Sequence, residues 1–235
     1  MSGYTDLFRR PGQGITVEQL HKEYKAGNIR FPALNGVSCN IAEGSVTVIQ
    51  GPSGCGKTTL LNILGGVDSA TRGIARVGET EISAISDEST LSRYRLHDVG
   101  FIFQAFNLIP GLSMIDNLQL PMSAADMNDQ QCRDRAHQLL KLVRLEGKAL
   151  KKPGELSSGE QQRVAIALAL ANDPCLILAD EPTSSLDSDN TKIVVELLRS
   201  LAHDFGKTVL VTTHDPLVGQ SGDRNYFMRD GSFSE

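Results

Sequence analysis

The chain is poor in aromatic residues and has no excess of positive charge. Aromatic residues make up 5% of its 235 residues, and tryptophan is absent. Base-stacking surfaces for single-stranded nucleic acid are therefore not expected. Lys plus Arg number 23 against 28 Asp plus Glu, which leaves a formal net charge of −5. Because nucleic-acid binders need a basic excess to displace counterions, we predict that no nucleic acid is bound.

Long apolar runs and paired cysteines are missing as well. The longest apolar stretch, Val164 to Ala171, spans about eight residues, whereas a bilayer-spanning helix needs ~18. No apolar segment of the signal-peptide kind follows Arg9 and Arg10. None of the four cysteines stands in a C-x-x-C pair, so we expect a reducing cytoplasm rather than disulfides or structural zinc. The 40% apolar content is that of a soluble globular protein with a sizeable core, and the length predicts one large domain or one core with an inserted subdomain.

Strand and helix patterns alternate along most of the chain. The predicted strands cover residues 15–20, 37–41, 46–50, 74–77, 99–103, 175–179 and 208–212. The predicted helices cover 59–64, 87–97, 158–171 and 187–204, the last with Ile193, Val194, Leu197, Leu198 and Leu201 facing inward. Between Ala105 and Leu156 we expect only helices and loops, with helix starts at Ser113 and Asn128. This order indicates an α/β core interrupted by a helical insert.

A glycine-rich loop follows the predicted strand over 46–50. It fits the pattern G-x-x-x-x-G-K-[ST]. Glycines let consecutive N–H groups point at one phosphate, and the following helix adds its positive N-terminal end. Lys57 would reach the β- and γ-phosphates, and the Thr58 hydroxyl would ligate Mg²⁺. The predicted nucleotide-binding loop consists of Gly51, Pro52, Ser53, Gly54, Cys55, Gly56, Lys57, Thr58 and Thr59.

Cys55 lies inside the phosphate loop. Its position near Lys57 and a helix N-terminus favours a thiolate. We expect alkylation of Cys55 to block ATP binding and bound ATP to protect the thiol. The alternative is a small filler side chain with no role.

Two adjacent carboxylates follow the apolar segment Cys175 to Ala179. Alternation along a strand would turn Asp180 and Glu181 in opposite directions, one toward a metal and the other toward an attacking water. Asp180 would hold Mg²⁺ through its water shell, and Glu181 would act as general base. A solvated strand end is the alternative for such a pair taken alone.

Leu156 to Arg163 resembles the signature sequence of ATP-binding cassette (ABC) ATPases, L-S-G-G-[EQ]-Q-x-R. It forms a second helix N-terminus, where Ser157, Ser158 and Gly159 would offer donors to a γ-phosphate, and the resemblance adds Glu160 to this set. A plain N-cap at Ser157 is the alternative. Ser158 stands where the family has glycine, and serine is disfavoured if the position needs positive φ or close backbone approach; we expect function to survive, with weaker turnover or dimer closure in that case.

The same resemblance assigns further site residues. Tyr24 is similar to the aromatic residue that stacks on adenine, and Gln104 to the glutamine that senses Mg²⁺. Ser185 to Asp187 resembles the segment between subunits, where Asp187 alone would be a helix N-cap, and His214 resembles the switch histidine at the γ-phosphate. The expected catalytic residues are Lys57, Glu181 and His214, and the expected Mg²⁺ ligands are Thr58, Gln104 and Asp180.

The resemblance implies an α/β P-loop NTPase (RecA-like) fold in a single domain, residues 1–235. The nucleotide-binding core with a parallel sheet and an N-terminal antiparallel β subdomain would cover 15–104 and 159–235, and the helical insert 105–158. Residues 1–14 are expected to form a flexible extension. Residues 61–66, 101–110 and 179–187 resemble the lipoprotein-releasing and macrolide-export (LolD- and MacB-like) branch, whose ATPase drives a permease.

In that family two chains pair head to tail, and each ATP lies between the phosphate loop of one chain and the signature of the other. ATP would therefore favour the closed dimer, and hydrolysis would open it. The expected partners are a second copy and a separate transmembrane permease, contacted through residues 105–121. The expected location is the cytoplasmic face of the inner or plasma membrane.

Other functions are compatible with parts of this pattern. A regulatory ABC ATPase would signal through a membrane partner to cell-wall hydrolases or a sensor without moving a substrate. A soluble ABC ATPase acting on DNA or ribosomes would carry coiled-coil inserts or tandem cassettes, which this sequence lacks. The signature and Glu181 argue against a small-molecule kinase.

Overall fold

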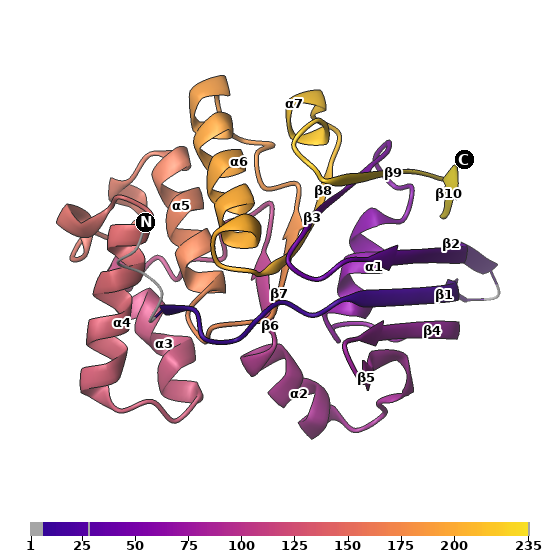
Figure 1. The fold of residues 1–235 in the computed structure, drawn as a ribbon, viewed down its shortest axis with the longest axis horizontal. Coiled ribbons are helices and arrows are strands. Elements are labelled where there is room, and N and C mark those ends of the chain that lie inside the picture. The colour runs from indigo at the N-terminus through magenta and orange to yellow at the C-terminus, as the bar shows by residue number, and fades with distance from the viewer. Residues whose placement is uncertain (1–6, 28, 235) are drawn as a thin grey trace.

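A computed structural model describes residues 7–27 and 29–234 of the chain. Two sheets and the helices around them form the molecule, with α3, α4 and α5 gathered at one end and an antiparallel sheet at the other (Figure 1). A larger, mainly parallel sheet lies between them. The predicted α/β architecture is confirmed.

The larger sheet has the strand order β10-β9-β3-β8-β7-β6. Its central strands are apolar runs buried on both faces, because helices cover both sides of a parallel sheet. Neighbouring strands are parallel except for the pair β9 and β10. The strands are β3 (Val46–Gln50), β6 (Val99–Ile102), β7 (Leu176–Asp180), β8 (Thr208–Thr213), β9 (Arg224–Arg229) and β10 (Ser232–Ser234).

The smaller sheet is antiparallel, with the order β2-β1-β4-β5. Its strands are β1 (Ile15–Ala26), β2 (Ile29–Ile41), β4 (Arg72–Val77) and β5 (Thr80–Glu81). β1 and β2 extend beyond the predicted strands as a long hairpin, in which Tyr24 lies opposite Phe31. Irregular pairing after Val17 breaks the polar-apolar alternation, which is why the sequence pattern ended β1 early.

Seven α-helices complete the described part of the chain. They are α1 (Lys57–Leu64), α2 (Glu88–His97), α3 (Met114–Ala124), α4 (Asp129–Leu142), α5 (Ser158–Ala169), α6 (Ser188–His203) and α7 (Pro216–Gly219). Caps begin them where the sequence indicates: Asn128 and Gln131 form a capping box at α4. Among the described residues, none of the helices has the length and apolar character needed to cross a bilayer.

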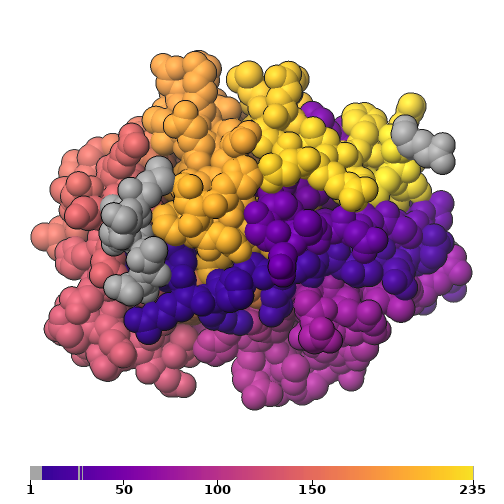
Figure 2. Space-filling view, in the orientation of Figure 1, coloured from indigo at the N-terminus to yellow at the C-terminus, as the bar shows by residue number. Residues whose placement is uncertain are grey.

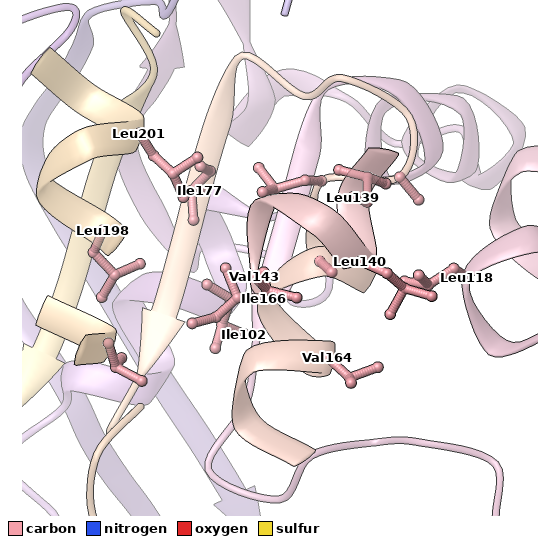
Figure 3. Close-up of a cluster of buried hydrophobic side chains, with 14 of the residues drawn as sticks. Ile102, Leu118, Leu139, Leu140, Val143, Val164, Ile166, Ile177, Leu198 and Leu201 are labelled. Carbon is pink, nitrogen blue, oxygen red and sulfur yellow. The ribbon is translucent and has the colours of Figure 1, made fainter. Parts of the chain in front are cut away.

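One apolar cluster joins the helical end of the molecule to the larger sheet. Leu139 and Leu140 of α4 pack in it with Ile166 of α5 and Ile177 of β7 (Figure 3). A continuous buried cluster of this kind holds the two parts together through burial of apolar surface, about 25 cal/mol per Å². The expected boundaries 105–158 of the insert stay a prediction.

Residues 7–14 are packed against the molecule, so the predicted flexible extension is wrong for this segment. Leu7 is 2% exposed. The Arg10 N–H donates to Asp173 Oδ2 at 3.0 Å, and the buried Lys207 donates to the Arg10 carbonyl at 2.5 Å. The segment runs from the helical end to β1 along the surface seen in Figures 1 and 2. Residues 1–6 of the predicted extension lie outside the described residues.

Two further predictions need correction. Ile193 on α6 is 38% exposed, whereas Val194, Leu198 and Leu201 are buried as predicted. The buried stripe of α6 is narrower than the periodicity suggested. β9, β10 and α7 were not predicted from the sequence, because β9 has only a short apolar run, Tyr226 to Met228, between polar ends, and β10 and α7 span only 3 and 4 residues.

Candidate functional site

The phosphate loop joins the end of β3 directly to the start of α1. Gly54 and Gly56 have φ of 79° and 111°, conformations that favour glycine. A Cβ on Gly56 would lie 2.5 Å from the Ala33 carbonyl oxygen of β2, so the loop also needs glycine for space. Gly56 is the N-cap of α1 and offers no side-chain acceptor, which leaves the first amides of the helix available to a phosphate.

Lys57 is folded into this loop. It is 6% exposed, and its Nζ donates to the carbonyl oxygens of Gly51 at 2.7 Å and Pro52 at 3.1 Å. The same Nζ lies 3.6 Å from Glu181 Oε1. The loop thus holds a buried cation beside a carboxylate, at the place where a phosphate would meet the helix N-terminus.

Thr58 and Asp180 bring oxygen atoms from α1 and β7 together. The Thr58 hydroxyl donates to Asp180 Oδ2 at 2.8 Å, and the Thr212 hydroxyl donates to Asp180 Oδ1 at 2.5 Å. Gln104 lines the same cavity from the segment after β6. A hydroxyl, a carboxylate and an amide oxygen are ligands that suit Mg²⁺, which keeps several waters in protein sites.

Glu181 does not continue the alternation of β7. The strand ends at Asp180, and Glu181 has φ of 49°, in the left-handed region. Its side chain therefore turns toward the phosphate loop, and both carboxylates line one cavity instead of facing opposite ways. His214, after β8, lies with Nδ1 2.8 Å from Glu181 Oε2. Asp180 and Glu181 therefore do not point in opposite directions as predicted, although both carboxylates lie beside the loop.

A cavity of about 420 Å³ collects most of the predicted residues. It is lined by Tyr24, Ala33, Ser53, Gly54, Gly56, Lys57, Thr58, Thr59, Gln104, Asp180 and Glu181. Gly51, Pro52 and His214 line an adjoining hollow with Gln50, Phe227 and Arg229. Ala33 of β2 was missed by the sequence analysis, because only pairing with β1 brings it to the loop.

Cys55 lies beneath the loop rather than in the cavity. It is 5% exposed and packs in the apolar cluster under the antiparallel sheet. A Cβ on Gly51 would lie 2.8 Å from its Sγ. The predicted alkylation depended on an accessible thiol, and this burial contradicts it; the filler alternative describes Cys55 better.

The signature residues stand apart from the cavity, at the start of α5. Ser157 is the N-cap and forms a capping box with Glu160. Glu160 is also paired with Lys148, and hydrogen bonds from Lys148 and the Ser157 amide lower the pKa of its carboxyl. Ser158 is exposed and lies in the first turn of α5 without positive φ, so a side chain is tolerated here.

Asp187 begins α6 beside the signature helix. Its Oδ1 accepts from the amides of Asn190 and Asp189, and hydrogen bonds, chiefly those from Asn190, lower the pKa of the Asp187 carboxyl. Asn190 Nδ2 donates to Asp187 Oδ2 at 2.8 Å, and Asn190 Oδ1 accepts from Arg163 Nη1 at 3.2 Å. Asn190, which sequence analysis missed, therefore connects the starts of α5 and α6.

Comparisons with known proteins identify the family of the chain. Residues 34–184 match the family model described as ABC transporter. The uncharacterized ABC transporter ATP-binding protein MJ0796 of Methanocaldococcus jannaschii is 43% identical over 221 residues, which cover 92% of this chain and 94% of that protein. The lipoprotein-releasing system ATP-binding protein LolD of Treponema pallidum is 40% identical over 218 residues, 93% of this chain and 96% of LolD.

Solved structures give the same result. The dimeric structure of the MJ0796 cassette has a TM-score of 0.87 and 42% identity, and covers 94% of this chain and 97% of its own. A dimeric post-hydrolysis state of MJ0796 bound to ADP and Pi matches with the same TM-score at 41% identity. With the phosphate loop, the acidic strand end and the signature in place, the chain belongs to the ABC transporter family as an ATP-binding, ATP-hydrolysing subunit.

Proposed function

We propose that this ATPase works as a head-to-tail dimer that closes on two ATP molecules and drives a separate membrane permease of the export or lipoprotein-release type. The observation that carries the proposal is the separation of two phosphate-binding helix starts in one chain. Lys57 and Thr58 line the cavity, whereas Ser157 to Gly159 do not. A second chain would bring its signature to the open side of the cavity. The dimeric MJ0796 cassettes support this arrangement.

Different residues of the cavity would bind different parts of the nucleotide. The Tyr24 ring, 42% exposed, would stack on the adenine, and the amides of Gly54 to Thr59 would bind the phosphates. Thr58, Gln104 and Asp180 would hold Mg²⁺, which neutralises charge on the phosphate oxygens. Lys57, released from its loop carbonyls, would contribute its charge to the β- and γ-phosphates.

Glu181 is the proposed general base for the attacking water. One of its oxygens lies 3.6 Å from Lys57 Nζ and the other 2.8 Å from His214 Nδ1. These two contacts fix the carboxylate at the edge of the cavity, where it would accept a proton from water. His214, whose side chain is 62% exposed, can also turn toward a γ-phosphate.

A groove of about 380 Å³ on another face is the proposed contact for the permease. Leu120 and Pro121 of α3 line it with Phe101 of β6, and Ile109 adds an apolar side chain that is 43% exposed. Several of these residues belong to the segment 105–121 expected to meet a partner. Similarity to LolD of Treponema pallidum supports the lipoprotein-release type. Such a contact would hold the subunit at the cytoplasmic face of the membrane.

Three variants test the dimer. Glu181→Gln should lower kcat by about 10²-fold or more while ATP still binds, so size-exclusion chromatography with Mg-ATP should show a stable dimer. Lys57→Ala should weaken ATP binding by about 100-fold and remain monomeric. Ser158→Glu, added to Glu181→Gln, places a negative charge where the opposing γ-phosphate would lie. Because an acidic residue is favourable in the first turn of a helix, this change should not destabilise the single chain. This double variant should bind ATP as a monomer.

Two outcomes contradict the proposal. A Glu181→Gln protein that remains monomeric at saturating ATP rules out closure by nucleotide alone. If the Ser158→Glu, Glu181→Gln variant dimerises as readily as Glu181→Gln alone, the signature does not lie in the dimer interface.

A further inference from the structure

A buried lysine lies over one face of the Tyr24 ring. Lys22, two residues earlier on β1, is 8% exposed, and its Nζ lies 4.9 Å from the centre of the ring. A cation over an aromatic face is attracted by the ring, but burying an ammonium costs several kcal/mol unless it is paired. The position of Lys22 therefore depends on its partner.

That partner is Asp68, in the turn after α1. Lys22 Nζ donates to Asp68 Oδ1 at 2.5 Å and to the Ser69 carbonyl at 2.7 Å, and the Tyr24 hydroxyl donates to Asp68 Oδ2 at 2.7 Å. Burial alone would raise the pKa of Asp68, but hydrogen bonds from Lys22, Tyr24 and Ser69 outweigh it and lower the pKa. One ionised carboxylate thus holds the lysine and the phenol together.

The arrangement leaves the ring with one usable face. Lys22 covers one side of it, while Tyr24 also lines the cavity of the phosphate loop. A planar base entering that cavity can stack only on the uncovered side. Hydrogen bonding of the hydroxyl to Asp68 restricts rotation of the side chain, so less rotamer freedom is lost when a base binds.

Asp68 also ties the ring to the helix that starts at the phosphate loop. The Asp68 amide donates to the Asn62 carbonyl of α1 at 3.1 Å. The Tyr24 hydroxyl lies 3.5 Å from Thr59 Oγ1, in the first turn of the same helix. Helix α1 therefore fixes the distance between the Tyr24 ring and the phosphate-binding amides.

We propose that Asp68 and Lys22 are positioning residues that hold the Tyr24 ring with one face open to the base of the bound nucleotide. Neither needs to touch the nucleotide; they act through Tyr24. The inference rests on the proposed stacking role of Tyr24 and adds the residues that orient its ring. Their contribution should appear only for ligands that carry a base.

The test compares MgADP with magnesium pyrophosphate by isothermal titration calorimetry, because neither ligand is hydrolysed. Tyr24→Phe keeps the ring and removes its hydrogen bond to Asp68, and Asp68→Asn removes the charge. Each should raise the Kd for ADP by about 3- to 10-fold, the effect of one hydrogen bond, and leave that for pyrophosphate unchanged within about twofold. In the double variant the two losses of ADP affinity should not add, because Tyr24→Phe already removes the hydrogen bond through which Asp68 acts on the ring.

Glu23→Gln is the matched control. Glu23 is the neighbour of Tyr24 on β1 and accepts from Arg30 at 3.3 Å in an exposed ion pair, so this variant should bind both ligands as wild type. Wild-type ADP affinity in Tyr24→Phe, together with a loss in Tyr24→Ala, would refute the positioning role and leave the stacking role intact. Unchanged affinity in Tyr24→Ala would remove the stacking role itself. Equal losses for ADP and pyrophosphate would overturn the inference, because the pair would then shape the phosphate loop.

Discussion

The first two residues of α5 differ in the side chain that each position accepts. Ser158 is exposed, whereas Gly159 is buried, and a Cβ there would lie 2.2 Å from Asn190 Oδ1. Asn190 cannot easily move aside, since Arg163 and Asp187 both hold its side-chain amide. The signature therefore needs glycine at position 159, because the side-chain amide of Asn190 in the same chain occupies the space that a Cβ would take.

The effect of Gly159→Ala on the free energy of unfolding should change sign when Asn190 is replaced by alanine. Gly159→Ala in the natural chain forces the new methyl group against Asn190 and should lower the free energy of unfolding by about 1–3 kcal/mol. In an Asn190→Ala background the obstacle is gone, and alanine is favoured over glycine in a helix by about 0.5–1 kcal/mol. The same Gly159→Ala change should then be neutral or stabilising.

Urea denaturation of the four proteins in this cycle measures the effect, provided that the m-values agree. Destabilisation of similar size in both backgrounds would show that Gly159 is needed for another reason. Unchanged stability in the natural background would show that Asn190 yields at no cost.

At the scale of elements, the sequence pattern predicted those strand bounds and helix starts that depend on residues close together in the chain. β3 has the predicted bounds, and Asn128 with Gln131 begins α4 as their spacing indicates. Strand β1 runs six residues past its predicted end at Leu20, because pairing with β2 and β4 sustains it where alternation fails. In the candidate site, the loop and carboxylates were recognisable from sequence, but the φ of 49° at Glu181 was not.

Long-range pairing explains the remaining miss, the segment 7–14. Asp173 accepts from the amides of Arg9 and Arg10, 164 and 163 residues away in the chain. Lys207 is fully buried against the same carboxylate, and burial lowers its pKa although Asp173 partly offsets the shift. No periodicity in the first residues predicts these contacts, since the partner charges lie in the segments just before β7 and β8.

Asp173→Asn should therefore destabilise the protein much more than the same change at a surface aspartate. Asp173 and Asp230 have φ of 54° and 48°, a conformation that asparagine tolerates, so the backbone cost is matched. Loss of the Asp173 charge leaves Lys207 buried without its counter-ion and should cost about 3 kcal/mol or more. Asp230→Asn, in an exposed pair with Arg229, should cost less than about 0.5 kcal/mol.

The difference between the two variants in denaturant midpoint is the decisive quantity. If Asp173→Asn is no less stable than Asp230→Asn, the anchoring of residues 7–14 by this ion pair is wrong.

At the scale of the whole molecule, the proposed permease groove and the nucleotide cavity are connected by one short stretch of chain. Phe101 on β6 and Asn107 line the groove, and Gln104 between them lines the cavity. A change at the γ-phosphate that moves Gln104 would therefore also shift the groove residues Phe101 and Asn107, which are each three positions away in the chain. The helical end supplies the opposite wall through α3, and the apolar cluster of Figure 3 anchors that helix to the sheet through Leu118.

A charge placed in the groove should separate permease binding from ATP hydrolysis. Leu120 is 53% exposed on the α3 wall, and Leu120→Asp would place a carboxylate in an apolar contact, weakening permease association by at least about tenfold, or 1.4 kcal/mol. The isolated variant should keep its ATPase rate, because Leu120 does not line the nucleotide cavity. Leu150→Asp, at an 83% exposed leucine of the same helical end outside the groove, is the control. Co-purification with the native membrane permease measures association; retention of Leu120→Asp equal to that of Leu150→Asp would move the permease contact to another face.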